Sequence, residues 1–254
     1  MNDSQKSEII TAFLQFRSEY DDLNLQCDNN SVAEYGIGGQ TIYLGYYCPS
    51  IIFDTIVGKA NRGKIIRKDI IEEKAGPFDY IYFKDLCGRL IKVEKYENYD
   101  SESVLKERSF FRYQENEIII ATYAFYDSEE PVLSQLCVCD YEKDRPIKYS
   151  LFTALPVSEL SEEELFFHGN WYCEDYCYDK NSRLHEVTVY RSIQNHSQTE
   201  KISFSTDANG NIVSYQPDGN NGTEAVYKVP KVNQRTIKRI VNDYHRFRNA
   251  SGLC

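Results

Sequence analysis

The sequence predicts a mainly β fold of the α+β class, in which one curved antiparallel sheet is built as a meander of degenerate hairpins. Three observations favour this fold: a short turn pattern that recurs six times, a high aromatic content, and helical periodicity at both ends of the chain. The chain has 254 residues, of which 21 are Tyr and 13 are Phe, and 41% of the residues are hydrophobic. Aromatic side chains suit a half-buried pleated surface, and this apolar content is sufficient for a substantial core.

The recurring pattern is an aspartate that opens a short polar turn, a small residue two or three positions later, and an aliphatic residue that starts the next apolar run. Its clearest copies are residues 83–90, 178–184 and 206–212, with the sequences FKDLCGRL, YDKNSRL and TDANGNI. Aspartate can accept hydrogen bonds from nearby backbone, and glycine or asparagine adopts the positive φ that such turns require. We therefore predict a tight hairpin at each copy.

Three weaker copies lie at residues 61–65, 113–118 and 141–147. The residues that close the six copies are separated by 25, 28, 29, 37 and 28 positions, a length that accommodates two strands and two turns. In four copies the first and third residues after the closing residue are largely apolar or amphipathic, which predicts a common face. The copies at Ile65 and Ile147 place lysine at such positions. The closing residues are Ile65, Leu90, Ile118, Ile147, Leu184 and Ile212.

The pattern resembles the YD-repeat unit of Rhs-type proteins, in which an aromatic residue precedes D-x-x-G-R-L. Residues 85–90 match this unit best, residues 178–184 match it with Ser182 in place of glycine, and residues 207–212 match it with Asn211 in place of arginine. The resemblance implies strand-turn-strand geometry and implies no catalytic residue. Long YD arrays build a large shell around a toxin, whereas this chain has too few and too divergent units for such a shell.

We interpret the chain as a single domain, residues 1–254, with a helix at each end of the repeated sheet. Helical spacing of apolar residues predicts these helices within residues 1–22 and 231–250. Residues 32–229 are expected to form the sheet. The longest interval contains a helical insertion near residues 158–167, where consecutive glutamates suit the positive end of a helix dipole.

Three other segments carry local predictions. Residues 21–31 are polar and show no helical or strand periodicity, so a loop is expected there. Residues 51–57 are predicted to form a strand. The highly charged residues 97–107 are predicted to form a loop or a short helix.

The charge is acidic and unevenly distributed. The chain carries a formal charge of −10, but the segment from Pro230 to the end contains six basic residues and one acidic residue. The other residues therefore carry a net charge of −15. An acidic body repels phosphate, which argues against nucleic-acid binding, and it suits solubility or a basic protein partner.

The eight cysteines do not follow the pattern of a secreted disulfide framework. No apolar run of the signal-peptide type follows residues 1–6, and no stretch approaches the roughly 20 apolar residues needed to cross a bilayer. We therefore expect a cytoplasmic protein without membrane association, whose cysteines are free thiols. Cys137 and Cys139 are expected to share one face of a strand without forming a disulfide.

No residue pattern indicates an active site, a metal site or a cofactor. His168, Cys173 and Cys177 offer metal-binding side chains, but their spacing is not one of the recurrent zinc patterns, so no metal is expected. No serine lies in a G-x-S-x-G motif, and 39 acidic residues do not by themselves define a catalytic pair. Catalysis is therefore not predicted, and a hydrolase with an unrecognised site stays open as an alternative.

We predict an interaction protein, most specifically an immunity protein that neutralises a basic toxin by direct binding. The acidic body, the hairpin pattern and the missing catalytic pattern favour this function, because an acidic surface can steer association with a basic toxin. Asp127, Glu129 and Glu130 are the candidate partner-binding residues, since three acids crowd one turn beside Pro131. The glutamates near residue 162 rank lower because the helix dipole explains them. A small-ligand or carbohydrate-binding β module is the alternative that the tyrosine-rich strands favour.

Overall fold

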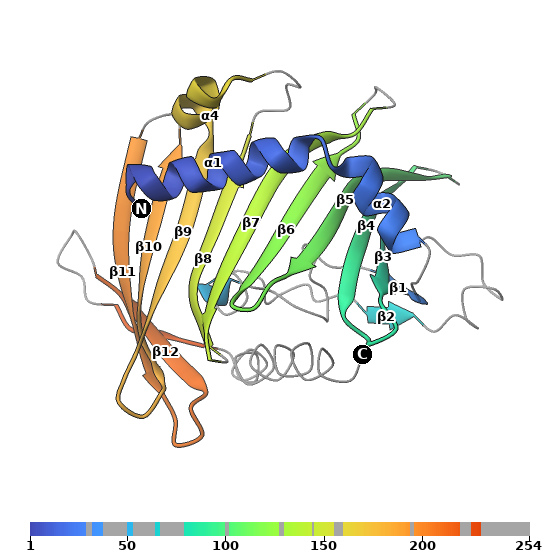
Figure 1. Cartoon of the computed structure of the whole chain (residues 1–254). Helices are drawn as coiled ribbons and strands as arrows, with labels where there is room; N and C mark the ends of the chain where they lie inside the picture. The colour runs from blue at the N-terminus through green and yellow to red at the C-terminus, as the bar shows by residue number, and fades with distance from the viewer. Residues whose placement is uncertain are drawn as a thin grey trace.

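The computed structural model contains one antiparallel sheet of 13 strands with helices packed against it (Figure 1). The strand order is β13-β12-β11-β10-β9-β8-β7-β6-β5-β4-β3-β1-β2, so the strands from β3 to β13 follow one another in sequence as a meander. This order confirms the predicted mainly β, antiparallel meander, and β2 and β13 lie at its two open edges. The structure describes residues 1–28, 32–37, 50–52, 64–66, 79–99, 102–126, 130–143, 145–154, 160–193, 196–218 and 225–229.

The helices in the described ranges are α1 (Asp3–Arg17), α2 (Tyr20–Asp28) and α4 (Glu162–His168). The strands are β1 (Val32–Ile37), β2 (Lys64–Ile66), β3 (Tyr80–Lys84), β4 (Leu90–Tyr99), β5 (Glu102–Tyr113), β6 (Glu117–Ala124), β7 (Val132–Glu142), β8 (Arg145–Thr153), β9 (Asn170–Tyr178), β10 (Leu184–Ile193), β11 (His196–Thr206), β12 (Ile212–Pro217) and β13 (Tyr227–Lys228). No described helix combines the length and the apolar composition needed to cross a membrane.

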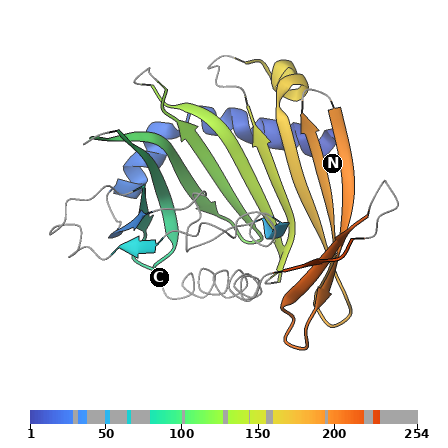
Figure 2. The same ribbon diagram turned by 180° about the vertical axis from the view of Figure 1, so that it is seen from behind.

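Each face of the sheet contributes to its own buried cluster. On the helix face, side chains of the central strands pack against α1, α2 and α4, and α1 lies across the strands (Figure 1). On the opposite face, seen from behind in Figure 2, they pack with Ile51, Ile52 and Val229. Strand β6 contributes to both clusters, because Ile119 faces the helices and Ile120 faces the other side.

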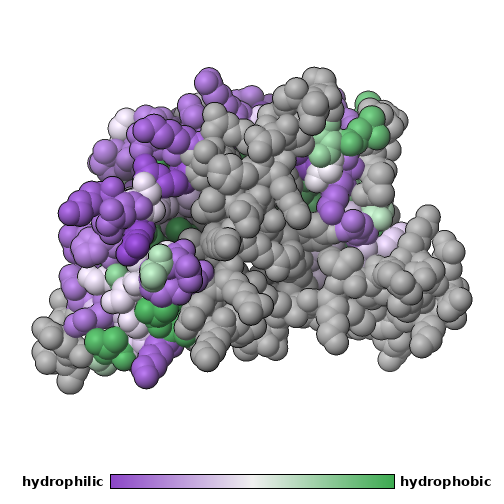
Figure 3. Space-filling view, turned by 90° about the horizontal axis from the view of Figure 1, so that it is seen from below, coloured by the Kyte–Doolittle hydropathy of each residue, from purple (hydrophilic) through white to green (hydrophobic). Residues whose placement is uncertain are grey.

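The hairpin pattern recognised in the sequence marks one rim of the sheet. The closing residues from Leu90 onward lie within or at the start of β4, β6, β8, β10 and β12, which confirms five copies of the repeat. Ile65 lies in β2, and residues 61–63 of its copy lie outside the described residues. The turns before β4, β6, β8, β10 and β12 all lie at the lower end of the strands in Figure 1, which we call the lower rim. The opposite end, near α4, is the upper rim. Seen from below, the described surface on the left of Figure 3 is mostly hydrophilic with small separate hydrophobic patches.

The turn around Asp207 shows why the pattern folds as a hairpin. The Asp207 carboxylate accepts hydrogen bonds from the backbone N–H groups of Asn209 and Asn211, both at 2.9 Å. The Asp207 backbone N–H donates to the Asn211 carbonyl at 2.9 Å, and Gly210 has φ of +78°. One aspartate therefore holds the turn by its side chain and its backbone, with a residue in the left-handed region where the chain reverses.

Two other copies repeat this geometry. Asp85 accepts from the N–H groups two and four residues ahead at 3.0 and 2.8 Å, and Asp179 does so at 2.8 and 2.9 Å. Gly88 has φ of +79°, and Ser182 holds the equivalent position at +61°. Serine in place of glycine therefore leaves the hydrogen-bonding pattern unchanged.

Tyrosine and arginine connect successive repeats. The Tyr113 hydroxyl donates to the backbone carbonyl of the first residue of β4 at 2.8 Å, and the Tyr178 hydroxyl donates to the Pro146 carbonyl in β8 at 2.7 Å. The Arg89 guanidinium lies 5.7 Å from the Tyr113 ring centroid, and that of Arg145 lies 4.9 Å from the Tyr178 ring. The tyrosine of one repeat thus binds both the backbone and the cation of the preceding repeat.

The predicted pleat is wrong where a bulge follows the aspartate turn. The register shifts at the starts of β4, β10 and β12. Leu90 and Val93 consequently lie in the same buried cluster on the opposite face, while Ile91 packs toward the helices. Alternation from the closing residue fails there because the extra residue reverses the order of faces. Strand β6 starts without a bulge, and Ile119 and Ala121 share a face as predicted.

The repeat before β8 is displaced by one residue. Pro146 is buried, whereas Ile147 is 38% exposed. This copy also departs from the others in its sequence, because Lys148 takes the position after Ile147.

Three helices were predicted outside the repeated strands, and the structure describes two of them. Helix α1 confirms the N-terminal helix, and its capping box at Asn2 explains its start. Helix α4 confirms the insertion near residues 158–167. The helix predicted at residues 231–250 lies outside the described residues.

Three local predictions are wrong. Helix α2 replaces the loop expected from residue 21, because polar side chains fix it to the sheet. Strands β4 and β5 include most of the charged segment 97–107, whose charges pair across the strands. Ile51 and Ile52, expected in a strand, are helical, and Glu174 binds the backbone N–H of Ile52.

Candidate protein-interaction surface

The predicted acidic turn lies at the upper rim, between β6 and β7. Glu130 is exposed, as a partner-binding residue must be, and Pro131 beside it is half-buried. Asp127 and Glu129 lie outside the described residues. Tyr126, on the other side of the turn, is 49% exposed. The described part of this turn therefore offers one carboxylate and one aromatic ring to the solvent.

The helix layer carries a large share of the net negative charge of the protein. Residues 3–28 contain six acidic and two basic residues, and α4 contains three acidic residues and no lysine or arginine. These two segments together have a net charge of −7, compared with −10 for the whole chain. Seven of the acids are exposed to solvent: Asp3, Glu8, Asp21, Asp22, Glu162, Glu163 and Glu164.

Helix α4 presents its first-turn glutamates in two different ways. The Glu164 carboxylate accepts a hydrogen bond from the Ser161 backbone N–H at 2.8 Å, and the Ser161 hydroxyl accepts one from the Glu164 N–H at 3.3 Å. The hydrogen bond from the Ser161 backbone lowers the pKa of Glu164. Glu162 and Glu163 take no part in this capping box and are exposed. Their carboxylates can therefore contact a partner as well as the positive end of the helix dipole.

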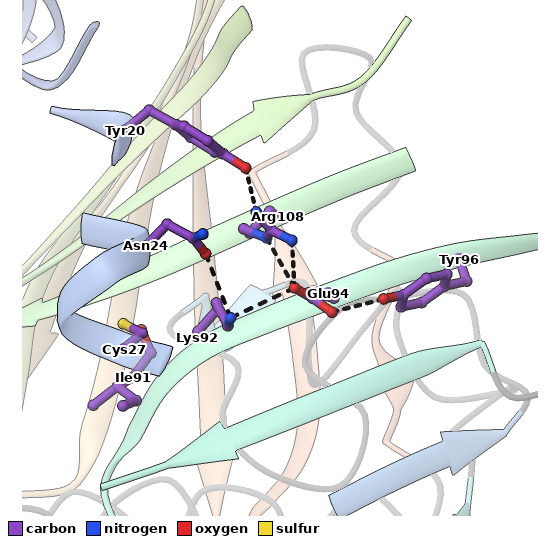
Figure 4. Close-up of polar contacts among 8 residues, drawn as sticks. All are labelled: Tyr20, Asn24, Cys27, Ile91, Lys92, Glu94, Tyr96 and Arg108. Carbon is purple, nitrogen blue, oxygen red and sulfur yellow. Dashed lines mark hydrogen bonds and ion pairs between the residues drawn. The ribbon is translucent and has the colours of Figure 1, made fainter. Parts of the chain in front are cut away.

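Helix α2 binds the sheet with one polar stripe and leaves its acids outside. Tyr20, Asn24 and Cys27 recur at helical spacing and contact the side chains or backbone of β4 and β5 (Figure 4). Asp21 and Asp22 lie on the other side and are exposed. The stripe is readable in the sequence, but its members are too polar to give an apolar periodicity.

The polar cluster beneath α2 is centred on Glu94 of β4. Arg108 lies opposite it on β5 and donates to the Glu94 carboxylate from Nε at 2.9 Å and from Nη2 at 2.7 Å. Tyr96 donates to the other carboxylate oxygen at 2.7 Å, and the third Arg108 nitrogen binds the Tyr20 hydroxyl. Figure 4 shows these side chains converging from one helix and two strands.

Lys92 adds a second cation to this cluster. Its Nζ lies 3.6 Å from Glu94, 3.5 Å from Asn24 and 4.0 Å from the centroid of the Phe83 ring. Lys92 is 2% exposed and Glu94 is 5% exposed. Buried charges of this kind hold a helix in one position because displacement leaves them unpaired.

The α1–α2 junction is held by another ion pair. The Arg112 guanidinium binds the Glu19 carboxylate and lies 4.3 Å from the Phe16 ring centroid. Glu19 is therefore engaged within the protein, unlike its neighbours Asp21 and Asp22. Hydrogen bonds and an ion pair therefore attach the helix that carries the exposed acids to the sheet.

A row of charged residues also crosses the helix face next to α1. Asp140 pairs in register with Glu117 on one side and Lys148 on the other, and Lys148 pairs with Asp175. Partial burial raises the pKa of Glu117 and of Asp140. Glu8 of α1 also raises the pKa of Asp140, so the acids of the helix and of the sheet face each other.

The opposite face contains a second buried carboxylate, that of Glu174 on β9. It accepts hydrogen bonds from the Tyr172 hydroxyl at 2.7 Å, the Tyr176 hydroxyl at 2.6 Å, the Ile52 N–H at 3.2 Å and the Ser50 hydroxyl. Burial raises the pKa of Glu174, which is fully inaccessible to solvent. Each described hydrogen bond to it comes from a neutral donor and joins the sheet to residues 50–52.

Four tyrosines on this face are engaged within the protein. The hydroxyls of Tyr113, Tyr172, Tyr176 and Tyr178 all donate hydrogen bonds to other protein groups. Burial raises the pKa of each of these tyrosines.

The alternative metal ligands do not meet in the described structure. Cys173 is buried and Cys177 is exposed, and His168 ends α4. Within the described ranges, no group of three His, Cys, Asp or Glu side chains has metal-binding geometry.

The cysteines follow the prediction in part. The Sγ atoms of Cys137 and Cys139 are buried and 3.5 Å apart, so this pair shares a face without a bond, as predicted. Cys87 is disulfide-bonded, so the prediction that all cysteines are free is wrong there. Since disulfides persist in oxidising compartments, the cytoplasmic assignment stays a prediction. Among the described residues, the cysteines outside a disulfide are Cys27, Cys137, Cys139, Cys173 and Cys177.

Comparison with known proteins places the chain in no family. It matches no family model and no curated protein. A solved protein of unknown function from Bacteroides fragilis is similar over 47% of this chain and 87% of its own, with 15% identity and a TM-score of 0.35. A porin-like protein from Bacteroides uniformis is similar over 58% of this chain and 86% of its own, with 8% identity and a TM-score of 0.25.

Proposed function

We propose that this chain is an interaction protein that binds a basic protein through its acidic helix layer. The observation that carries the proposal is the net charge of −7 on the segments that form α1, α2 and α4, with seven acids exposed. The more specific function is that of an immunity protein that blocks a basic toxin by direct binding.

The arrangement of charges supports this function physically. Basic groups of the support, such as Arg108 and Arg112, are engaged by Glu94 and Glu19, so they do not cancel the exposed acids. A surface of one sign accelerates the encounter with an oppositely charged partner and weakens as salt screens it. Glu130, the described acid of the predicted partner-binding turn, is also exposed, shortly before the start of β7.

Co-expression with a toxin domain encoded beside this gene tests the function. The wild-type chain is expected to bind the toxin and to restore growth. Reversing Glu162 and Glu163 to Lys, or Glu129 and Glu130 to Lys, is expected to slow association at low salt by about tenfold and to reduce its salt dependence. Stopped-flow association rates at several salt concentrations measure both effects.

Glu115→Lys with Glu142→Lys is the matched control, because it changes the net charge equally at the lower rim, where both residues are exposed. This control is expected to associate at nearly the wild-type rate. Equal slowing by control and upper-rim variants would assign the effect to net charge alone and reject the surface. Absence of both binding and protection with the neighbouring toxin would reject the immunity function.

A further inference from the structure

Three aromatic rings converge on the ammonium group of Lys6. Its Nζ lies 5.2 Å from the ring centroid of Phe166, 5.7 Å from that of Trp171 and 5.8 Å from that of Tyr190. An ammonium within about 6 Å of a ring centroid is attracted by the negative face of the ring. We call Phe166, Trp171 and Tyr190 the aromatic cage.

The cage is assembled from three elements around the start of α1. Phe166 belongs to α4, Trp171 to β9 and Tyr190 to β10, and these elements surround the N-terminal end of α1 (Figure 1). The capping box at Asn2 fixes the first turn of α1 and thereby the position of Lys6.

The cage holds its cation by ring faces and not by a carboxylate. Within the described residues, the Lys6 ammonium forms no ion pair and contacts the three rings. The buried Trp171 Nε1–H has no hydrogen-bond partner among the described residues. The indole therefore contributes its ring to this site rather than a hydrogen bond.

We propose that Phe166, Trp171 and Tyr190 form a binding site for alkylammonium groups, which Lys6 occupies in the free protein. Lys6 and Phe166 are half-buried, so the site lies at the protein surface. Glu162 and Glu163 are exposed on the same helix as Phe166 and attract cations toward it. Resting on the proposed function, the natural ligand of this class is a lysine side chain of the basic partner.

The single tryptophan of the chain reports directly on this site, because Trp171 is part of the cage. Choline chloride titrated into Lys6→Ala is expected to change Trp171 fluorescence saturably. The wild-type protein is expected to bind choline more weakly than Lys6→Ala, because the tethered ammonium of Lys6 already contacts the three rings. Sodium chloride at equal ionic strength corrects for salt.

Two controls separate cation binding from the filling of space. The neutral isostere 3,3-dimethyl-1-butanol is expected to give no saturable change with Lys6→Ala. Lys6→Met, which keeps a long side chain without a charge, is expected to bind choline more weakly than Lys6→Ala. Circular dichroism verifies folding, and Lys6→Ser carries the same expectation if Lys6→Ala does not fold.

A folded Lys6→Ala protein without saturable choline binding would overturn the proposal, as would equal binding of the neutral isostere. The titration contains no protein partner, so its failure leaves the test of the acidic surface intact. Conversely, failure to find a basic partner leaves the choline result unchanged.

Discussion

Glu94 and Glu174 are buried carboxylates on opposite faces of the same sheet, and different groups satisfy them. Glu94 is 5% exposed and lies between Arg108 and Lys92, with one tyrosine hydroxyl. Glu174 is inaccessible and receives two tyrosine hydroxyls, a serine hydroxyl and a backbone N–H. One site is ionic and fixes α2, and the other is built from neutral donors and fixes residues 50–52.

The difference separates two ways of burying a negative charge. Cations neutralise the buried carboxylate directly, but they are left as unpaired charges if the carboxylate is removed. Neutral donors satisfy the lone pairs without cancelling the charge, so burial still raises the pKa of Glu174. The two carboxylates should therefore respond differently to substitution and to pH.

The largest effect is expected from Glu94→Ala. This change leaves the buried Lys92 and the half-buried Arg108 without their carboxylate and is expected to reduce the free energy of unfolding by about 3–5 kcal/mol. Glu174→Ala leaves only neutral groups unpaired and is expected to cost less, about 1–3 kcal/mol. Urea unfolding of both variants measures the two losses. A smaller loss for Glu94→Ala than for Glu174→Ala would reverse the comparison.

A smaller effect concerns pH and Glu174→Gln. Because burial raises the folded pKa of Glu174, the folded state favours the protonated carboxyl. The stability of the wild type relative to Glu174→Gln should therefore be greatest below about pH 4.3, the ordinary glutamate pKa, and should fall as pH rises through the folded pKa. Urea unfolding of both proteins from pH 4 to 8 measures this difference. A difference that is constant or grows with pH would contradict the neutral-donor description.

The smallest effect concerns the tyrosine hydroxyls that bind the two carboxylates. Tyr172→Phe and Tyr96→Phe each remove one hydroxyl from a buried carboxylate and are each expected to cost about 1 kcal/mol. Tyr172→Phe should cost more, because no described cation contacts Glu174 in compensation. Chemical unfolding at neutral pH compares the pair. A larger loss for Tyr96→Phe would mean that the ionic cluster depends more on its hydroxyl than on its cations.

The lower rim was predictable because each of its turns is determined locally. Asp85, Asp179 and Asp207 bind backbone atoms no more than four residues away, so a short sequence window contains the whole interaction. The bulges after these turns depend on the partner strand as well. Alternation counted along one strand therefore assigned Ile91 and Val93 to one face, which is wrong.

The charged support of the candidate surface was not predictable in the same way. Lys92, Glu94 and Arg108 have the composition of a solvent-exposed segment. Only the structure shows that Lys92 and Glu94 are buried and that Arg108 binds Glu94 from the neighbouring strand. The exposure of Glu130 was foreseen from the short polar turn. Lys6 and its three rings are far apart in the sequence, and no local pattern joins them.

The placement of the aspartate turns also determines where this chain can change in length. The aspartate turns before β4, β10 and β12 hold their own hairpins, and the longest interval between repeats adds α4 at the upper rim. After that insertion Trp171 still pairs in register with Phe152. We therefore expect the connections at the upper rim to tolerate changes in length. The next turn at the lower rim still sets the register of its own hairpin.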